Sequence, residues 1–315
     1  MGQDWLSVQE GIRACLGTDI SLLNEVNSGL LEHSGKQLRP MLALLMARSC
    51  GGKANHDSIS LAVASELLHN ATLLHDDVAD ESDRRRGNPT VRALMGPSVS
   101  VLVGDFWLVR AVRSILDAGK GRDMAISMFS KTLSDLAEGE MLQLQKASSG
   151  DTDEKDYFDI IYRKTASLFV STLTLAAVSV DAPDEMVDAA AGYGRCLGLA
   201  FQIRDDIFDY MAEGEIGKPV GVDIMEGKIT LPLLCALGNV DVQEQERIRR
   251  MVRNVTAESR DEIIAFVRNN GGIEGTQAVL EQYSAKAVEA LSCIPASKDR
   301  EILEQLALSL SKRTR

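Results

Sequence analysis

The chain has 315 residues, of which 45% are hydrophobic and only 7 are proline, so it is long enough to bury a large globular core. Its formal net charge of −12 argues against nucleic acid as a partner, because nucleic-acid-binding proteins usually present a basic face. A polyanion that binds this chain must therefore do so at a few selected lysines and arginines, with the help of divalent metal.

No membrane-spanning or secreted class is indicated. The amino-terminal stretch MGQDWLSVQE lacks a basic region followed by an apolar one, which a signal peptide requires. The longest weakly polar run, residues 168–180, is too short to cross a bilayer. The 5 cysteines never form a CxxC pair, a usage typical of reduced thiols in a cytosol. We therefore expect a cytoplasmic protein with at most peripheral contact to a membrane.

Helical periodicity dominates the chain. In chain order, apolar residues recur three and four apart in segments 58–77, 123–145 and 185–210. Short glycine and proline signals separate such segments, and sustained strand-like alternation is hard to find. We expect an all-α fold, a single domain over residues 1–315 built as a bundle of about ten to thirteen mostly antiparallel helices around a central cavity. Residues 148–156 are expected to form an exposed loop.

Aspartates gather at the ends of two of these helical segments. In LLHDDVADESDRRRGNPT, residues 73–90, three aspartates lie within about a turn and a half of helix; they are Asp76, Asp77 and Asp80. A second triplet occurs in FQIRDDIFD, residues 201–209; it consists of Asp205, Asp206 and Asp209. Like charges this close on a helix repel each other, so each cluster requires a cationic partner. A single copy would be most simply a solvated acidic helix end, whereas two copies favour a binding function.

The DDxxD spacing suits a metal site. Its first and last aspartates lie one turn apart on one helix face, and two such helices side by side would point about four to six carboxylates into a common cleft. Hard oxygen ligands suit Mg²⁺, which takes one or two carboxylates and completes its shell with water and phosphate oxygens. Neighbouring arginines can bind the remaining oxygens of a diphosphate. The pattern therefore predicts a site for Mg²⁺ and a diphosphate.

Further short motifs occur in a fixed order along the chain. They are GKQLRP (35–40), HDDVADESDRRRGNPT (75–90), GD (104–105), GE (139–140), KT (164–165), FQIRDDIFD (201–209) and GKPVGVDIMEGKITLP (217–232). In this order the sequence resembles the trans-isoprenyl diphosphate synthases, the polyprenyl synthetase family that includes farnesyl, geranylgeranyl and octaprenyl diphosphate synthases. The resemblance covers nearly the whole chain and is nearest in pattern to the long-chain, octaprenyl type.

The resemblance implies a prenyltransferase that condenses isopentenyl diphosphate head-to-tail onto an allylic diphosphate, with farnesyl diphosphate as the expected primer. About three Mg²⁺ ions per active site are implied, held by the six aspartates of the two triplets. The residues implied to bind the allylic diphosphate are Arg85, Lys164, Thr165, Gln202, Lys218 and Lys228. The residues implied to bind isopentenyl diphosphate are Lys36, Arg39, His69 and Arg86.

Several of these residues have simpler interpretations. Without the motif, Lys36 and Arg39 could be ordinary surface charges and His69 a core histidine. Arg84 is the bystander of its arginine trio, because the family pattern places its two arginines at the next two positions. Lys228 fits the pattern, although an indirect role is open for it.

Product length is predicted from the residues that precede the first triplet. Thr72 and Ala71 lie about one turn deeper than Asp76, where short-chain members of the family carry phenylalanine or tyrosine. Leu68, another turn deeper, is only a partial obstruction. We therefore expect a long all-trans product of about C40 or more, of the kind used for quinone side chains. The floor of the product tunnel is expected around Met128, Phe129 and Leu133.

Alternative functions remain open at this point. The chain could be a shorter-chain farnesyl or geranylgeranyl diphosphate synthase. A terpene cyclase needs only one diphosphate site, so GKQLRP and the second complete DDxxD disfavour it. A non-catalytic synthase subunit commonly lacks aspartates from one motif, whereas this chain keeps all six. The resemblance further implies a homodimer.

Overall fold

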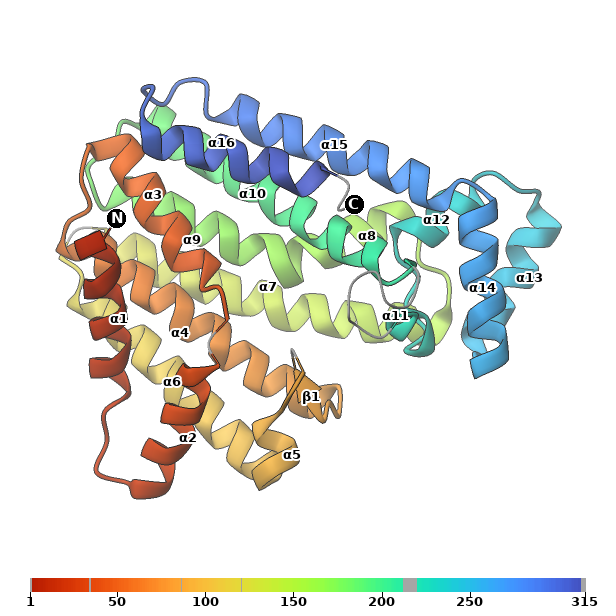
Figure 1. The fold of residues 1–315 in the computed structure, drawn as a ribbon, viewed down its shortest axis with the longest axis horizontal. Helices are drawn as coiled ribbons and strands as arrows, with labels where there is room; N and C mark the ends of the chain where they lie inside the picture. The colour runs from red at the N-terminus through yellow and green to blue at the C-terminus, as the bar shows by residue number, and fades with distance from the viewer. Residues whose placement is uncertain (1, 34, 86, 120, 212–219, 313–315) are drawn as a thin grey trace. The chain divides into compact units, whose positions relative to one another are not determined.

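The structure, a computed structural model, describes residues 2–33, 35–85, 87–119, 121–211 and 220–312. Sixteen α-helices, one π-helical turn and one pair of two-residue strands lie within them, so the predicted all-α fold is confirmed (Figure 1). The chain divides into two compact units. Unit 1 comprises Met1–Phe129, Ser171–Ala190 and Cys293–Glu301, and unit 2 comprises Ser130–Val170, Ala191–Ser292 and Ile302–Arg315. The prediction of a single domain over residues 1–315 stays a prediction.

The elements of the first third of the chain are α1 (Gly2–Leu16), α2 (Ser21–Glu32), α3 (Leu38–Gly51), α4 (His56–Ala79), β1 (Arg84–Arg85), β2 (Asn88–Pro89), α5 (Val91–Met95) and α6 (Pro97–Asp117). The middle of the chain forms α7 (Arg122–Ser149), α8 (Glu154–Ile161), the π-helical turn η1 (Tyr162–Ala166), α9 (Ser167–Val178) and α10 (Asp184–Phe208). The remaining helices are α11 (Val222–Met225), α12 (Leu231–Leu237), α13 (Val242–Arg253), α14 (Ala257–Asn269), α15 (Gly272–Ala290) and α16 (Lys298–Ser311).

The helices outnumber the predicted ten to thirteen because several are very short. Helices α5, α11 and α12 have 5, 4 and 7 residues, lengths at which sequence periodicity carries no signal. Helix α7 runs to Ser149 and α8 begins at Glu154, so the connection between them is shorter than the loop predicted over 148–156.

Helix α4 is the central helix of unit 1, and it packs lengthwise against α6 (Figure 1). From residue 60 to residue 68 every side chain of α4 is buried, as expected of a helix surrounded by other elements rather than one with a single apolar face. Leu61 and Leu68 of α4 and Ile115 of α6 are at most 3% exposed. This packing fixes the position of the acidic carboxyl-terminal end of α4 within unit 1.

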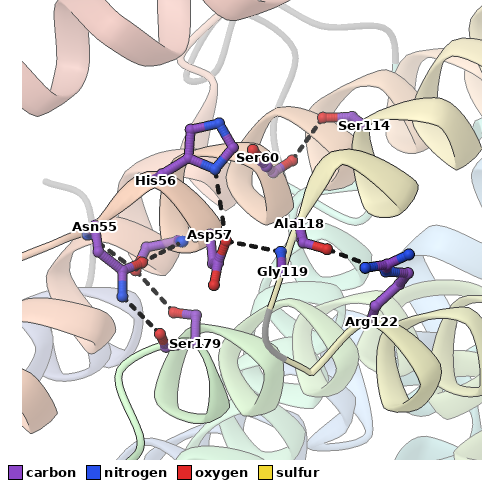
Figure 2. Close-up of polar contacts among 10 residues, drawn as sticks. Asn55, His56, Asp57, Ser60, Ser114, Ala118, Gly119, Arg122 and Ser179 are labelled. Atoms are coloured by element: carbon purple, nitrogen blue, oxygen red, sulfur yellow. Dashed lines mark hydrogen bonds and ion pairs between the residues drawn. The ribbon is translucent and has the colours of Figure 1, made fainter.

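Polar contacts secure the opposite end of α4 (Figure 2). Asn55 and Ser58 form a reciprocal capping box, and the Asn55 amide also donates to the Ser179 carbonyl at 2.7 Å. The Asp57 carboxylate accepts a hydrogen bond of 2.9 Å from the backbone N–H of Gly119, which follows α6. The start of α4 is therefore tied both to the chain after α9 and to the chain after α6.

A buried tryptophan connects α6 to the amino-terminal helices of unit 1. Trp107 is 1% exposed, and its indole N–H donates to the Asn27 side-chain oxygen at 2.8 Å. The Asn27 amide in turn donates to the Leu16 carbonyl at 3.0 Å, at the end of α1. Because both polar groups of Asn27 are satisfied, a buried asparagine is tolerated at this position.

Unit 2 has a compact apolar cluster of its own near the carboxyl end of α10. Its buried members come from helices α11 to α14 and from the flanking residues Tyr210, Val220 and Ile229; the helical members include Ile224, Leu233, Ile248 and Val267. The cluster anchors the short helix α11, which contributes Ile224 to it. None of the helices in the described part of the chain combines the length and the apolarity needed to span a membrane.

Replacing Trp107 with phenylalanine should lower the free energy of unfolding by about 2 kcal/mol, because it opens a cavity and leaves the buried Asn27 oxygen without a donor. Urea denaturation followed by circular dichroism measures the change. The control is Trp5→Phe, at a half-buried position on α1, which should cost clearly less. Equal losses for the two variants would contradict the role assigned to the Trp107 hydrogen bond.

Candidate active site

The first aspartate triplet lies at the carboxyl-terminal end of α4, in unit 1. Asp76 and Asp77 are in its last turn, and Asp80 follows the helix, with its backbone N–H bonded to the Asp76 carbonyl at 2.8 Å. Asp77 is buried, Asp76 is half-buried and Asp80 is exposed. The three carboxylates of this triplet therefore differ in their exposure to solvent.

The buried member of the triplet is paired with an arginine. The Arg85 Nε donates to the Asp77 Oδ1 at 2.8 Å. Burial raises the pKa of the Asp77 carboxyl above its usual value, and the Arg85 guanidinium partly offsets the rise. Arg84 instead points along its own hairpin and donates to the Gly87 carbonyl at 3.2 Å. Arg86, another predicted binding residue, lies outside the described residues.

A short hairpin carries these arginines back towards the triplet. Strands β1 and β2 pair antiparallel, with Arg85 opposite Asn88. Thr90 closes the hairpin, because its backbone N–H donates to the Asp83 carbonyl at 3.0 Å and its hydroxyl to the Ser82 carbonyl at 2.7 Å. The basic stretch that follows the aspartates is therefore folded back by the Thr90 contacts.

The GD motif lies beside the residue that precedes the first triplet. A Cβ atom added at Gly104 would overlap the imidazole of His75, so only glycine lets α6 approach α4 this closely. The next residue, Asp105, places a carboxylate oxygen 3.3 Å from the His75 Nε2. The motif thus has a packing role, which its sequence did not reveal.

The residues predicted to bind isopentenyl diphosphate also lie in unit 1. Lys36 is exposed just before α3, and Arg39 is half-buried in the first turn of that helix. Between them Gln37 adopts a left-handed conformation, with a φ of 45°, and accepts a hydrogen bond of 2.5 Å from the Gln9 amide. His69 is half-buried on α4, about two turns before Asp76. Their binding roles stay predictions.

The predicted chain-length residues lie deeper along α4. Ala71 and Leu68 are each 1% exposed, and Thr72 is half-buried with its hydroxyl donating to the His69 carbonyl at 2.8 Å. Of the residues expected at the tunnel floor, Phe129 is buried, whereas Met128 and Leu133 are half-buried; all three are on α7. Ala71 is therefore a small side chain in the interior, and its role in setting the product length stays a prediction.

The second triplet lies in unit 2, at the end of α10. Asp205 is exposed, Asp206 is 2% exposed and Asp209 is half-buried just after the helix. Its middle aspartate is held by hydrogen bonds on both oxygens: the Tyr157 hydroxyl donates at 2.5 Å and the Gln202 amide at 2.8 Å. The Thr165 hydroxyl donates in turn to the Gln202 side-chain oxygen at 2.8 Å. These hydrogen bonds join three predicted site residues, Asp206, Gln202 and Thr165, through their side chains.

The KT motif occupies the π-helical turn η1, between α8 and α9. Such turns are rare and occur frequently at functional sites. A Cβ at Gly139 of the GE motif would lie 2.7 Å from the Arg163 Cβ, so glycine allows α7 to approach η1. The following residue, Glu140, forms an ion pair with Lys164. The GE and KT motifs are therefore in direct contact.

The last aspartate of the second triplet binds the backbone of a later segment of the chain. The Asp209 carboxylate accepts hydrogen bonds from the backbone N–H groups of Val222 at 2.9 Å and Asp223 at 3.1 Å, so it caps the start of α11. Burial raises the pKa of Asp209, and these backbone donors oppose the rise. Its role as a metal ligand stays a prediction, and Lys218 lies outside the described residues.

A cavity of about 130 Å³ in unit 2 collects the charged groups of this region. It is lined by predicted site residues, namely Lys164, Thr165, Gln202, Asp206 and Lys228. It is also lined by residues that the sequence analysis missed, among them Gln143, Lys146, Tyr157 and Asp223. Helical spacing could have found two of them: Lys146 lies seven residues after Gly139 on α7, and Tyr157 seven residues before Lys164.

Burial governs the electrostatics of the cavity. It raises the pKa of Asp206 to about 7, and the hydrogen bonds from Tyr157 and Gln202 oppose the rise. It likewise raises the pKa of Asp223, with a further rise from the nearby Asp206 carboxylate. Lys228 lies near this pair, with its ammonium nitrogen 3.8 Å from an Asp223 oxygen and in an ion pair with Glu226. A cation that approaches these carboxylates would therefore stabilise their ionised form.

Each triplet offers ligands that fit a hard divalent cation, because carboxylate oxygen is the ligand that Mg²⁺ prefers. In unit 1 these are Asp76, half-buried, and Asp80, exposed; in unit 2 the exposed Asp205 is one. Within the described ranges, no group of three or more His, Cys, Asp or Glu side chains is arranged to hold a metal ion. Because Mg²⁺ often takes only one or two carboxylates together with water and phosphate oxygens, these residues suit an ion bound jointly with a phosphorylated ligand.

Comparison with known proteins gives matches over most of the chain. The family described as polyprenyl synthetase matches residues 20–268. The chain is 38% identical over 307 residues to the octaprenyl diphosphate synthase of Escherichia coli (strain K12), covering 97% of this chain and 94% of that protein. It is 36% identical over 309 residues to the all-trans-nonaprenyl-diphosphate synthase (geranyl-diphosphate specific) of Rhodobacter capsulatus, with 97% and 94% covered.

Solved structures agree with the sequence matches. A decaprenyl diphosphate synthase from Rhodobacter capsulatus superposes with a TM-score of 0.93 at 35% identity, covering 100% of this chain and 97% of that one. A polyprenyl synthase from Caulobacter crescentus CB15, complexed with calcium and isoprenyl diphosphate, gives a TM-score of 0.90 at 35% identity, covering 99% and 96%. Divalent metal is therefore bound by solved relatives of this chain.

Replacing Asp206 with asparagine should stabilise the metal-free protein. The buried carboxylate has a raised pKa, so its ionisation costs stability increasingly from about pH 4 up to pH 7, and the gain should level off above that pH. Asparagine can keep the hydrogen bonds, because the Gln202 amide can flip and the Thr165 hydroxyl can rotate. We expect the thermal midpoint in EDTA to rise by about 2–4 °C at pH 8 and by less at pH 5.

The matched control is Asp205→Asn, at the exposed neighbouring position, whose midpoint should change little. A lower midpoint for Asp206→Asn at both pH values would show that the Asp206 carboxylate is required for folding.

Proposed function

The chain belongs to the polyprenyl synthetase family, and we propose that it is a long-chain, all-trans polyprenyl diphosphate synthase, which condenses isopentenyl diphosphate head-to-tail onto an allylic diphosphate. The family and the prenyltransferase class expected from the motifs are confirmed by these matches. Relatives that are 35–38% identical to this chain are named as octaprenyl, nonaprenyl and decaprenyl diphosphate synthases, which supports a long product.

The lysine-lined cavity of unit 2 is the observation that carries this proposal. A diphosphate needs several donors and positive charges in a small space, and the cavity of about 130 Å³ provides Lys164, Thr165 and Lys228. The Asp206 and Asp223 carboxylates, which also line it, would face the divalent metal that accompanies the diphosphate. We assign the two lysines and the threonine, together with Gln202 and the hairpin residue Arg85, to the allylic diphosphate. These residues would stabilise the negative charge that develops on the diphosphate as the carbon–oxygen bond breaks.

We propose Mg²⁺ as the metal, about three ions per active site, with the six aspartates of the two triplets as ligands. When bound, the metal neutralises charge on the departing diphosphate. The burial of Asp77 and Asp206, with arginine, tyrosine and glutamine partners, keeps the middle carboxylate of each triplet fixed. Asp76, Asp80 and Asp205 are half-buried or exposed and can therefore turn towards an ion, whereas Asp209 is held by the backbone N–H groups of Val222 and Asp223.

Lys36, Arg39 and His69 are assigned to isopentenyl diphosphate, the substrate whose diphosphate stays intact. Such a substrate needs binding rather than ionisation, so lysine, arginine and histidine suffice. No protein nucleophile is required, because the double bond of isopentenyl diphosphate attacks the allylic carbocation. The departed diphosphate can accept the proton that leaves, and no residue is assigned as a general base.

We further propose that the chain acts as a homodimer. On α6, Leu102, Val109 and Leu116 are 68%, 65% and 49% exposed, and their spacing of seven residues places them on one helix face. A monomer would leave this apolar stripe in water, whereas a second copy could cover it with its own α6. The very hydrophobic product also suggests peripheral contact with a membrane during release.

The function is tested by incubating the purified protein with Mg²⁺, farnesyl diphosphate and labelled isopentenyl diphosphate. We expect an elongated all-trans diphosphate, seen by reverse-phase chromatography after phosphatase treatment, and no product in EDTA. Asp205→Asn should lower kcat/KM by about 100-fold or more. A cyclic hydrocarbon would instead indicate a terpene cyclase, and absence of turnover a partner subunit.

Ala71→Phe should shorten the product to about C15 or C20, because the added ring would block the path of the growing chain along α4. The reaction is analysed by the same chromatography. Since Ala71 is buried, Thr72→Phe provides a second variant at a half-buried position, and Ala137→Phe, at an exposed position on α7, serves as the control. An unchanged chain length in both α4 variants would show that the product runs elsewhere.

A further inference from the structure

Three lysines line the cavity of unit 2, and only two of them belong to the motifs that carry the family resemblance. Lys164 is the lysine of the KT motif, and Lys228 lies in the segment after the second triplet. The third, Lys146, is on α7 and matches none of the motifs. Its side chain is 18% exposed, compared with 24% for Lys164 and 19% for Lys228, so the three are similarly accessible.

Each of the three lysines is held by a carboxylate that does not itself line the cavity. Lys164 is paired with Glu140, and Lys228 with Glu226. The Lys146 ammonium nitrogen lies 2.7 Å from an Asp156 oxygen and 3.3 Å from an Asp151 oxygen. Its hydrogen bond with Asp156 raises the pKa of Lys146, so the ammonium stays charged. Each of the three lysines thus lines the cavity and has at least one carboxylate partner outside its lining.

A purely structural role for Lys146 would be to hold the connection between α7 and α8, where Asp151 lies. That connection is already held from α13. The Arg249 guanidinium donates to the carbonyls of Gly150 at 3.2 Å and Thr152 at 3.1 Å, and Arg253 donates to the Ser149 carbonyl at 3.4 Å. A partly exposed lysine–carboxylate pair typically adds less than about 1 kcal/mol. The connection therefore does not need Lys146.

The position of Lys146 on α7 suits ligand binding. Gly139, Gln143 and Lys146 are spaced four and three residues apart, so they share one helix face. That face contacts η1 at Gly139 and lines the cavity at Gln143 and Lys146. Lys146 thus lies two turns along the helix from the point where α7 meets the KT motif.

We propose that Lys146 is a third lysine ligand of the allylic diphosphate, and that it exchanges its ion pair with Asp156 for an oxygen of the terminal phosphate. A phosphate with up to two charges attracts the ammonium more strongly than a single carboxylate does. The aspartate pair holds Lys146 at the edge of the cavity before the substrate arrives. This inference rests on the proposed function, because it assigns Lys146 to the substrate of that same site.

The test compares Lys146→Gln with Lys131→Gln, a control on the same helix whose lysine also pairs with a carboxylate, that of Asp135. Steady-state kinetics with Mg²⁺ should show a KM for farnesyl diphosphate about tenfold higher in Lys146→Gln, with the KM for isopentenyl diphosphate unchanged and kcat within about twofold. Calorimetric titration with inorganic diphosphate and Mg²⁺ should show a similar loss of affinity. The control should match the wild type in both measurements.

Asp156→Asn separates a binding role from a structural one. Asparagine keeps the side-chain oxygen that caps α8 and removes the charge that holds Lys146, so diphosphate affinity should be unchanged or higher. If Lys146 were only a structural residue, Asp156→Asn and Lys146→Gln would lower the thermal midpoint together and affect diphosphate binding equally. That result would overturn the proposal, as would an unchanged KM for farnesyl diphosphate in Lys146→Gln.

The failure of the proposed function has a different signature. A wild-type protein that binds diphosphate without condensing the two substrates would refute the synthase, whereas weaker diphosphate binding by Lys146→Gln would still support the role of Lys146. A wild-type protein that neither binds diphosphate nor turns over would refute both.

Discussion

The candidate active site depends on buried carboxylates, Asp77 and Asp206, whose ionised form is supported by hydrogen bonds or by a neighbouring positive charge. A buried carboxylate is strongly disfavoured unless hydrogen bonds or positive charge compensate for the lost water. In unit 1 the compensation for Asp77 is the Arg85 guanidinium, and in unit 2 the compensation for Asp206 consists of neutral donors from Tyr157 and Gln202. The two middle aspartates are thus fixed by different chemistry, although their sequence motifs look alike. Burial outweighs these partners in both cases, because both pKa values remain raised.

The same logic of compensation applies to the lysines of the cavity. Each ammonium group is paired with a carboxylate, which reduces the repulsion between positive charges in a small volume. A diphosphate can then replace or supplement these carboxylates without the protein having to create new charge.

Two glycine-acid motifs in the sequence acquire a physical explanation from packing. In each, the glycine permits close contact of two helical segments and the next residue supplies a carboxylate to a basic side chain. Gly104 lies against His75, which then faces Asp105, and Gly139 lies against η1, where Glu140 meets Lys164. Both contacts occur directly beside predicted site residues. Their role is therefore to position the basic or acidic group next to them rather than to bind a ligand.

The sequence by itself determined the helical class and the family, because both are written in local patterns: apolar residues three and four apart, and short motifs at fixed positions. It also identified Asp206, Gln202 and Thr165, which the structure joins by hydrogen bonds. Only the tertiary structure showed that Asp223 lines the same cavity, that Arg85 pairs with Asp77, and that Asp209 caps α11. These facts depend on which side chains from distant segments meet and on how far each is removed from water. Neither property is encoded in the spacing of residues along one helix, because both arise when separate helices pack together.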